Sequence, residues 1–400
     1  MENEYDAIVV GAGPSGSSCA CLLACSGAKV LLIDKQQFPR DKVCGDAIGG
    51  KAQNVLEKLG LLQELGKKGF LRSSGLVFSS PSGKEAEIQL KEGPGRGFVC
   101  KRAEFDTILF SHAKQMCDVL EKCTVIDLLL KNGKVCGVKA VKEGKEAEYL
   151  AKVIIGADGV SSVVAAKTGC LKLDPKHTCS ALRGYYTRVK GLRKNIEVHF
   201  LPECMPGYFW IFPLSENEAN VGVGMLVSDI MEKKLNLQKV FDNCIKSKRI
   251  AARFVGAVPG KVSGWSIPLA SAKRKCAGNG FVLLGDAASL VDPFSGEGMG
   301  NGMKSAAIAA KVLGDALKRG EITEQDCLSY EKMLWEEIGD DVKSSYNMQK
   351  LGKNSFLLDF VIGKAEKSKQ VREEIGAMIT DSAQKSKTSD PMFYLRMLFA

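Results

Sequence analysis

Three glycines near the N-terminus are spaced so that they could hold a phosphate group. Gly11, Gly13 and Gly16 form a Gly-x-Gly-x-x-Gly pattern that also contains Ser15. Glycines permit a tight turn and let backbone N–H groups at the start of a helix approach a pyrophosphate. Asp34 follows at the distance expected of an acid that binds adenosine ribose hydroxyls. The pattern predicts a dinucleotide site; the alternative is a structural turn followed by a surface aspartate.

Two later motifs pair glycine with aspartate, and each follows a short apolar run. Asp158 lies in Gly-Ala-Asp-Gly after residues 153–155, and Asp286 lies in Gly-Asp-Ala-Ala after residues 281–284. In this order the three motifs resemble those of the large group A flavoprotein family, which includes aromatic hydroxylases and prenyl reductases. The resemblance covers residues 1–320. It implies that FAD is the cofactor, that Asp286 contacts its ribityl and pyrophosphate region, and that Asp158 belongs to the cofactor site.

Other positions match the cofactor site of that family. Arg102 opens an Arg-Ala-Glu-Phe-Asp segment that is similar to the family's Arg-x-x-Phe-Asp at a helix start. Its guanidinium could pair with phosphate or ribityl oxygens of FAD, or it is a surface arginine that caps the helix. Backbone N–H groups at Gly298 and Met299 would face the flavin N1–C2=O edge, where the reduced anion concentrates charge. Lys35 and Val125 complete the implied cofactor contacts.

Two segments resemble the geranylgeranyl reductases within that family. Residues 38–46 match their Pro-Arg-x-Lys-x-Cys-Gly segment. Residues 206–213 match the Tyr-x-Trp-x-Phe-Pro motif that these reductases use along the prenyl cavity. The proline that usually lies three residues before the tyrosine is shifted, because Met205 holds that position and Pro206 follows.

The second of these segments places three aromatic residues at alternate positions. Tyr208, Trp210 and Phe212 would project from one face of a strand, because side chains along a strand point to opposite faces in turn. Together they predict a wide apolar wall that suits a polyisoprenoid chain. The alternative is an ordinary sheet core.

The first segment contains a thiol that could take part in the reaction. Cys44 and Gly45 lie in a loop that the resemblance brings close to the flavin. Cys44 is therefore a candidate proton donor or redox partner, and it is the one catalytic residue predicted. The alternative is that Cys44 and Gly45 are small so that the loop can pack on the isoalloxazine.

The resemblance implies an FAD-dependent reductase that saturates double bonds of geranylgeranyl chains, with archaeal-type digeranylgeranylglycerophospholipid as the expected substrate. An isolated alkene is not electrophilic, so its reduction needs a proton at one carbon and a hydride from the flavin at the other. One alternative is a flavin monooxygenase, although Ser289 stands where hydroxylases usually have histidine. Others are a prenyl-binding escort protein, and a reductase of geranylgeranyl diphosphate, a chlorophyll precursor or a quinone prenyl chain. The electron donor, NAD(P)H or a ferredoxin-like protein, stays open.

The positions of these motifs require an α/β fold with a doubly wound, Rossmann-like parallel sheet. The expected strands are 5–10, 29–33, 125–130, 135–141, 152–155 and 281–284, and the expected helices are 14–25, 103–116 and 298–317. Alternating apolar residues between 179 and 264 predict an inserted antiparallel sheet. We therefore expect an FAD-binding domain at 1–170 with a substrate-domain excursion at 71–98, a prenyl-binding domain at 171–275, a return to the FAD domain at 276–320, and a helical region at 321–400.

Composition narrows the class of protein. The 400 residues carry a net charge of +10 without a basic block, which argues against nucleic-acid binding. That charge fits peripheral contact with anionic membrane surfaces or a phosphorylated substrate; simple solubility is the alternative. No apolar run approaches the roughly 18–20 residues that span a bilayer, and the N-terminus lacks a signal peptide, so we expect a cytoplasmic protein. The 14 cysteines show no metal-ligand spacing, which predicts reduced thiols and no metal site.

Overall fold

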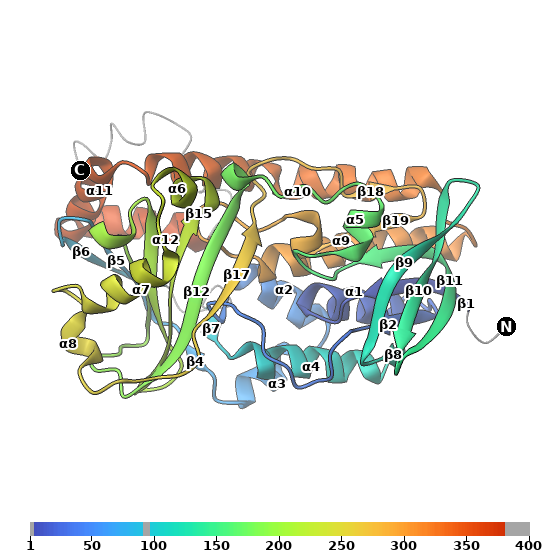
Figure 1. Cartoon of the computed structure of the whole chain (residues 1–400), viewed down its shortest axis with the longest axis horizontal. Coiled ribbons are helices and arrows are strands. Elements are labelled where there is room, and N and C mark those ends of the chain that lie inside the picture. Colours follow the sequence, from blue (N-terminus) through green and yellow to red (C-terminus); the bar gives the residue numbers. More distant parts are fainter. Residues whose placement is uncertain (1–3, 91–96, 381–400) are drawn as a thin grey trace.

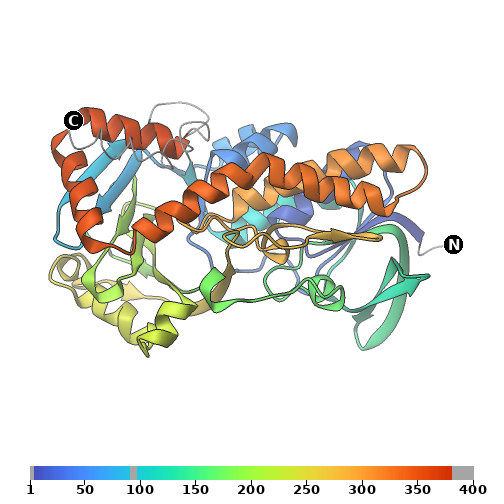
Figure 2. The ribbon, with the colours of Figure 1, turned by 90° about the horizontal axis from the view of Figure 1, so that it is seen from above.

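Two large sheets, connected by long helices, organise the structure (Figures 1 and 2). The computed structural model describes residues 4–90 and 97–380. Within these residues one mainly parallel sheet lies toward the N-terminal end of the molecule, and a mainly antiparallel sheet lies at the other end. α10 (Glu324–Leu351) extends from the first sheet toward the helices that cover the second.

The predicted β–α–β unit at the N-terminus is present. β1 (Glu4–Val10) leads into α1 (Pro14–Cys25), and the chain returns in β2 (Val30–Ile33). β1 lies between β2 and β11 (Lys145–Gly156), and β11 pairs with β19 (Phe281–Leu283); all of these pairings are parallel. The carboxyl ends of four neighbouring strands therefore meet at one edge of the sheet, where α/β proteins bind ligands.

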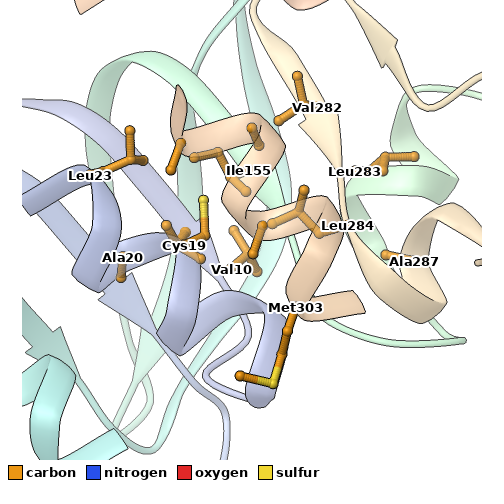
Figure 3. Close-up of a cluster of buried hydrophobic side chains, with 14 of the residues drawn as sticks. Val10, Cys19, Ala20, Leu23, Ile155, Val282, Leu283, Leu284, Ala287 and Met303 are labelled. Carbon is orange, nitrogen blue, oxygen red and sulfur yellow. The ribbon is translucent and has the colours of Figure 1, made fainter. Parts of the chain in front are cut away.

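Small side chains let α1 and α9 (Met299–Lys318) lie close to this sheet (Figure 3). Cys19 and Ala20 of α1 are completely buried, as are Ile155 of β11 and Met303 of α9. This packing explains why the first helix has cysteine, serine and alanine where most amphipathic helices have leucine, because larger side chains would hold the helix away from the strands.

The remaining elements of the first region surround this core. They are α4 (Arg102–Lys114), β8 (Asp118–Leu120), β9 (Cys123–Lys131), β10 (Lys134–Lys142), α5 (Val163–Lys167), β18 (Ala277–Gly278) and the 3₁₀ turn η3 (Gly285–Ala288). A small separate sheet consists of β3 (Ala47–Ile48), β4 (Leu71–Arg72) and β7 (Phe98–Val99), and it lies near α2 (Gly50–Lys58) and α3 (Leu62–Lys67).

The second sheet has the predicted antiparallel core. It is built from β12 (Thr178–Thr187), β13 (Asn195–His199), β14 (Gly207–Pro213), β15 (Glu218–Leu226), β16 (Val258–Pro259) and β17 (Ser263–Pro268). β5 (Gly75–Ser79) and β6 (Glu85–Gln89) extend the same sheet, because β5 pairs in parallel with β13. The other elements of this region are η1 (Pro175–His177), η2 (Pro202–Cys204), α6 (Val227–Glu232), α7 (Leu237–Lys246) and α8 (Ala251–Phe254).

The chain is mainly helical from α10 to residue 380, and the remainder of the predicted helical region, 381–400, lies outside the described residues. α10 is followed by α11 (Ser355–Lys367) and α12 (Lys369–Thr380), which pack against β6 of the second sheet (Figure 2). Among the helices that the structure describes, none combines the length and the apolar character needed to cross a membrane.

The α/β fold with a doubly wound sheet and an inserted antiparallel sheet is confirmed, and one boundary differs clearly from the prediction. β11 begins at Lys145 and is longer than the expected strand at 152–155. Its first half pairs with β10 through a tight turn in which Glu143 and Gly144 have positive φ. This half begins Lys-Glu-Ala-Glu and has no buried residue, so it lacks the apolar run that indicated the buried half.

Candidate functional site

A cavity of about 1300 Å³ extends from the edge of the parallel sheet to the antiparallel sheet. Single-ligand pockets commonly measure roughly 300–1,000 Å³, so this cavity has room for a cofactor and a second molecule. The predicted residues that line it are Gly11, Gly13, Ser15, Asp34, Lys35, Cys44, Gly45, Arg102, Val125, Asp158, Tyr208, Trp210, Phe212, Asp286, Gly298 and Met299. Gly16 lies behind the wall, where an added Cβ would meet the Gly11 carbonyl oxygen at 1.8 Å.

The glycine-rich turn has the shape that a phosphate requires. Gly11 has a φ of +97°, and a Cβ there would be 2.5 Å from the Ala157 carbonyl oxygen, so only glycine fits. Gly13 is the N-cap of α1 and supplies no side-chain partner to the first turn of the helix. The N–H groups of that turn therefore lack a side-chain cap at the point where the helix dipole favours an anion, which fits a dinucleotide pyrophosphate.

Asp34 is fixed by the backbone around it. Its Oδ2 accepts a hydrogen bond from the N–H of Ala12 at 2.8 Å, and its Oδ1 accepts one from the N–H of Gln36, also at 2.8 Å. The side chain is buried, which contradicts the alternative of a surface aspartate. A carboxylate can accept about four hydrogen bonds, so it retains capacity for ribose hydroxyls.

The aspartates of the two later motifs make different contacts. Asp158 accepts hydrogen bonds from the Ser162 hydroxyl at 2.5 Å and from the Val163 N–H at 2.6 Å, and so holds the start of α5. Burial raises the pKa of Asp158, and these hydrogen bonds partly offset that effect. Asp286 instead pairs with Lys42, with Nζ and Oδ2 2.9 Å apart. Of the two carboxylates, Asp286 is therefore the one paired with a cationic side chain.

Arg102 is not a surface cap. It is 3% exposed, and its guanidinium donates two hydrogen bonds to Asp106, from Nε at 2.6 Å and from Nη2 at 2.7 Å. Arg40 also donates to Asp106, at 2.7 Å. Burial would lower the pKa of Arg102, but Asp106 and the nearby Cys44 side chain raise it. Arg102 thus supplies a fixed positive charge in the cavity wall, beside the Cys44 thiol.

The three aromatic residues share one face of β14, as predicted. The ring centroids of Tyr208 and Trp210 are 6.1 Å apart, and those of Trp210 and Phe212 are also 6.1 Å apart. Phe209 and Ile211, which alternate with them, are completely buried in a separate core on the other face. The alternative of an ordinary core is therefore wrong for the aromatic face, because that face lines the cavity.

Three contacts fix the aromatic wall. The indole N–H of Trp210 donates to the Asn220 side-chain oxygen at 2.9 Å. The ring lies flat over Gly222, where a Cβ would be 2.1 Å from it. The Tyr208 hydroxyl donates to the Ser295 carbonyl oxygen at 2.8 Å, which ties the wall to the loop before α9.

The loop of Cys44, Gly45 and Asp46 touches both halves of the cavity. The Cys44 carbonyl oxygen accepts hydrogen bonds from Arg183 at 3.3 Å and from Asn220 at 2.7 Å. A Cβ on Gly45 would be 2.9 Å from the Phe212 ring, so glycine is needed for this loop to reach the aromatic wall.

Asp46 is the notable residue that the sequence reasoning missed. It is completely buried and has a φ of 65°, a conformation in which aspartate and asparagine are favoured among non-glycine residues. Its Oδ2 accepts hydrogen bonds from the Tyr185 hydroxyl and from the Asn220 amide, both at 2.8 Å. Burial raises its pKa to about 6, against the opposing effects of these partners and of Arg183 and Arg102. Its position directly after Cys44–Gly45 was the signal that could have found it.

The far end of the cavity is apolar. It lies between the second sheet and α11, and its lining there includes Phe78, Val198, Phe200, Leu358, Val361 and Ile362.

All 14 cysteines are free thiols, and the described residues contain no group of three or more acidic, histidine or cysteine side chains that could hold a metal ion.

Comparison with known proteins agrees with this architecture. Residues 4–333 match the family of FAD binding domains. A digeranylgeranylglycerophospholipid reductase of Methanocella arvoryzae is 32% identical over 363 residues, which cover 88% of this chain and 88% of that protein. Digeranylgeranylglycerophospholipid reductase 1 of Methanopyrus kandleri is 31% identical over 341 residues, covering 84% of this chain and 88% of that one.

A solved structure has the same fold. The geranylgeranyl bacteriochlorophyll reductase-like protein of Thermoplasma acidophilum superposes with a TM-score of 0.84 at 24% identity, covering 97% of this chain and 98% of that one. The family match at residues 4–333 includes all the motifs that line the cavity, and the reductases match most of the chain. The chain therefore belongs to the FAD-binding domain family and, within it, to the geranylgeranyl reductases, and it is an FAD-dependent oxidoreductase.

Proposed function

We propose that this protein saturates the double bonds of geranylgeranyl chains on archaeal-type digeranylgeranylglycerophospholipid. The observation that carries the proposal is the single cavity that joins the dinucleotide motifs to an aromatic wall and an apolar end. The polar groups of a polar substrate would find no hydrogen-bond partners at the apolar end, whereas an isoprenoid chain needs none. The names of the relatives support the glycerophospholipid as the carrier of the chain.

The cofactor-binding residues are assigned from the same cavity. FAD, when bound and reduced, supplies a hydride. Gly11, Gly13 and Ser15 would hold its pyrophosphate at the start of α1, and Asp34 its ribose. The other proposed contacts of the cofactor are Lys35, Cys44, Gly45, Arg102, Val125, Asp158, Asp286, Gly298 and Met299. Gly16 would act indirectly, because only glycine there leaves room for the turn at Gly11.

The substrate side of the cavity positions the alkene and excludes water. Tyr208, Trp210 and Phe212 would hold the chain by apolar contact along one side. Exclusion of water protects a developing positive charge on the alkene from side reactions, and fixed placement of the double bond removes much of the entropic cost of the reaction.

A monooxygenase is the main alternative within the same fold. The geometry gives a reason to prefer the reductase, because the loop at the aromatic wall presents a thiol and a carboxylic acid, which are proton donors. Ser289 follows the Gly-Asp-Ala-Ala motif in a left-handed conformation, with a φ of 58°. It occupies the position at which the related hydroxylases have histidine.

The decisive experiment is anaerobic incubation of the dithionite-reduced protein with digeranylgeranylglycerophospholipid, followed by mass spectrometry. We expect the product to gain mass in steps of two hydrogens. Parallel samples with geranylgeranyl diphosphate and a prenylated quinone would identify the preferred carrier. A product that gains oxygen under air, with no saturated product, would show a monooxygenase; unchanged lipid that co-purifies with the protein would show an escort.

Two partners complete the proposal. The reaction consumes two electrons for each double bond, so a donor such as NAD(P)H or a ferredoxin-like protein must reduce the flavin. The substrate is a membrane lipid, and the net charge of +10 favours peripheral contact with an anionic membrane surface. Sedimentation with anionic and neutral vesicles would test this contact.

A further inference from the structure

A buried carboxylic acid lies where the cofactor motifs meet the aromatic wall. Asp46 lines the cavity and is 0% exposed. Asn220 connects it to the wall, since its amide nitrogen donates to Asp46 Oδ2 at 2.8 Å while its amide oxygen accepts from Trp210 at 2.9 Å. Gly45, the preceding residue, is in contact range of Phe212. Asp46 is thus held against the surface that would bind the prenyl chain.

The two carboxyl oxygens have different surroundings. Oδ2 accepts hydrogen bonds from Tyr185 and Asn220. Oδ1 is buried and has no hydrogen-bond partner among the residues at 4–90 and 97–380. An ionised oxygen in that position would be uncompensated, which is costly. A proton on Oδ1 removes the charge, and Asp46 itself is among the residues that border the cavity.

We propose that Asp46 is the acid that protonates the alkene, an inference that rests on the proposed function. The π bond of the alkene breaks, its electron pair forms a C–H bond with the proton from Asp46, and the other carbon accepts a hydride from the reduced cofactor. Asp46 is left as a carboxylate and regains its proton from water after the product leaves. The cofactor is oxidised by two electrons, which the donor replaces.

Burial and the neighbouring polar groups shift the pKa of Asp46 in opposite directions. Tyr185 and Arg183 on β12 and Arg102 at the start of α4 face Asp46, and each favours its ionised form. Cys100, whose pKa is raised by burial and then by nearby acids that include Asp46, also lies close. Burial outweighs the favourable partners and leaves the pKa of Asp46 at about 6. A donor with a pKa near the operating pH is protonated often enough to act, yet releases its proton readily.

The geometry favours Asp46 over Cys44 as the proton donor. A carboxylic acid is a stronger acid than a thiol, and an isolated alkene is a weak base, so the carboxylic acid transfers its proton more readily. Tyr185 and Asn220 act as positioning residues, because they orient Oδ2 and so direct Oδ1.

The test is Asp46→Asn, a substitution of the same size. Asparagine tolerates the φ of 65°, and its side-chain oxygen can still accept from Tyr185. We expect the variant to retain FAD and to be reduced by dithionite at the normal rate, while prenyl saturation falls by about 10²–10⁴-fold, the range for loss of a general acid. Asp127→Asn is the control, because Asp127 lies outside the cavity lining, is 49% exposed and pairs only with Lys167 among the ion pairs described. This control should stay near wild-type activity.

A second readout is independent of activity. Infrared difference spectra of the substrate-free protein should contain a protonated carboxyl band that disappears near pH 6 and is absent from Asp46→Asn. Tyr185→Phe removes a hydrogen bond to the ionised form, so it should move this transition and the pH profile of saturation to higher pH. Equal rates of prenyl saturation in Asp46→Asn and wild type would overturn the role of Asp46 but leave the proposed function intact. A wild-type protein that saturates no prenyl chain would overturn the proposed function as well.

Discussion

Lys42 and Asp286 form an ion pair across the cavity although they lie 244 residues apart in the sequence, with Nζ and Oδ2 separated by 2.9 Å. Lys42 belongs to the loop that also carries Cys44 and Asp46, and Asp286 belongs to the motif after β19. Both side chains are partly exposed to the cavity, at 24% and 16%. The pair therefore connects the loop at the aromatic wall to the proposed cofactor contact.

Asp286→Ala should lose FAD. The carboxylate would hydrogen-bond the cofactor, and a hydrogen bond to a charged group contributes about 1.5–3 kcal/mol, which corresponds to about one to two decades of affinity. The FAD content after extensive dialysis, measured by absorbance, checks this outcome. Lys42→Met is the control, since it breaks the ion pair but keeps the carboxylate, and it should retain more FAD. Full yellow colour in Asp286→Ala would contradict the assignment.

Arg102→Met should destabilise the protein by about 3 kcal/mol. Removal of one partner from a buried ion pair typically costs about 3–5 kcal/mol, and the lower end applies because Arg40 still pairs with Asp106. The free energy of unfolding in urea measures the effect. Arg319→Met, which breaks an exposed pair with Asp326, should cost less than about 1 kcal/mol. Similar decreases in the free energy of unfolding for the two variants would mean that the buried pair stabilises the fold no more than the exposed pair.

Cys44→Ser should keep FAD and slow reoxidation of the flavin by substrate, with a smaller effect than Asp46→Asn. Cys44 lines the cavity beside Gly45 and Arg102, so the change alters contacts at the reacting end. Stopped-flow traces of flavin reduction and reoxidation separate the two half-reactions. A slower reoxidation in Cys44→Ser than in Asp46→Asn would make the thiol the proton donor in place of Asp46.

Trp210→Ala should give incompletely saturated products at normal FAD content. The indole removes roughly 150–250 Å² of apolar surface from water, which is of order several kcal/mol at about 25 cal/mol per Å². A long chain can slide along the weakened wall, so part of the loss appears as poor positioning of the double bonds. Trp210→Phe keeps the apolar contact but loses the hydrogen bond to Asn220, and so separates the two roles. Product patterns by mass spectrometry that match wild type in both variants would exclude β14 from the prenyl site.

The free energy of unfolding of Asp46→Asn, relative to that of wild type, should increase as pH rises. The pKa of Asp46 is about 6 in the folded protein, compared with an ordinary value of 3.8, so between these pH values the folded state retains a proton that the unfolded state has lost. Stability from this group is therefore present below about pH 4 and is lost as pH rises through about 6, by roughly 3 kcal/mol in total. Urea unfolding at pH 4.5 and about pH 7.5 with saturating FAD measures the difference. Asp127→Asn should show no such rise with pH, because the backbone N–H of Leu128 lowers the pKa of Asp127 instead of raising it.

Local features of the cofactor site could be predicted from the sequence because they depend on backbone conformation. Gly11 and Gly16 occupy positions that a Cβ would block, and such positions leave a readable pattern in the chain. The alternation of Tyr208, Trp210 and Phe212 likewise follows from the two-residue period of a strand, so their common face was predictable. The sequence alone did not decide whether that face was core or cavity.

Contacts between residues that are distant in the chain were decided only by the tertiary structure. The burial of Asp46, its bare Oδ1 and its bonds to Tyr185 and Asn220 arise from packing of the loop after β2 against β12 and β15. A sequence does not distinguish a buried carboxyl group from an exposed one. The pKa of the buried group changes because it loses hydration and gains partners that no local pattern encodes. The pairing of β5 with β13 has the same cause: nothing in a short strand specifies which of several edges it will join.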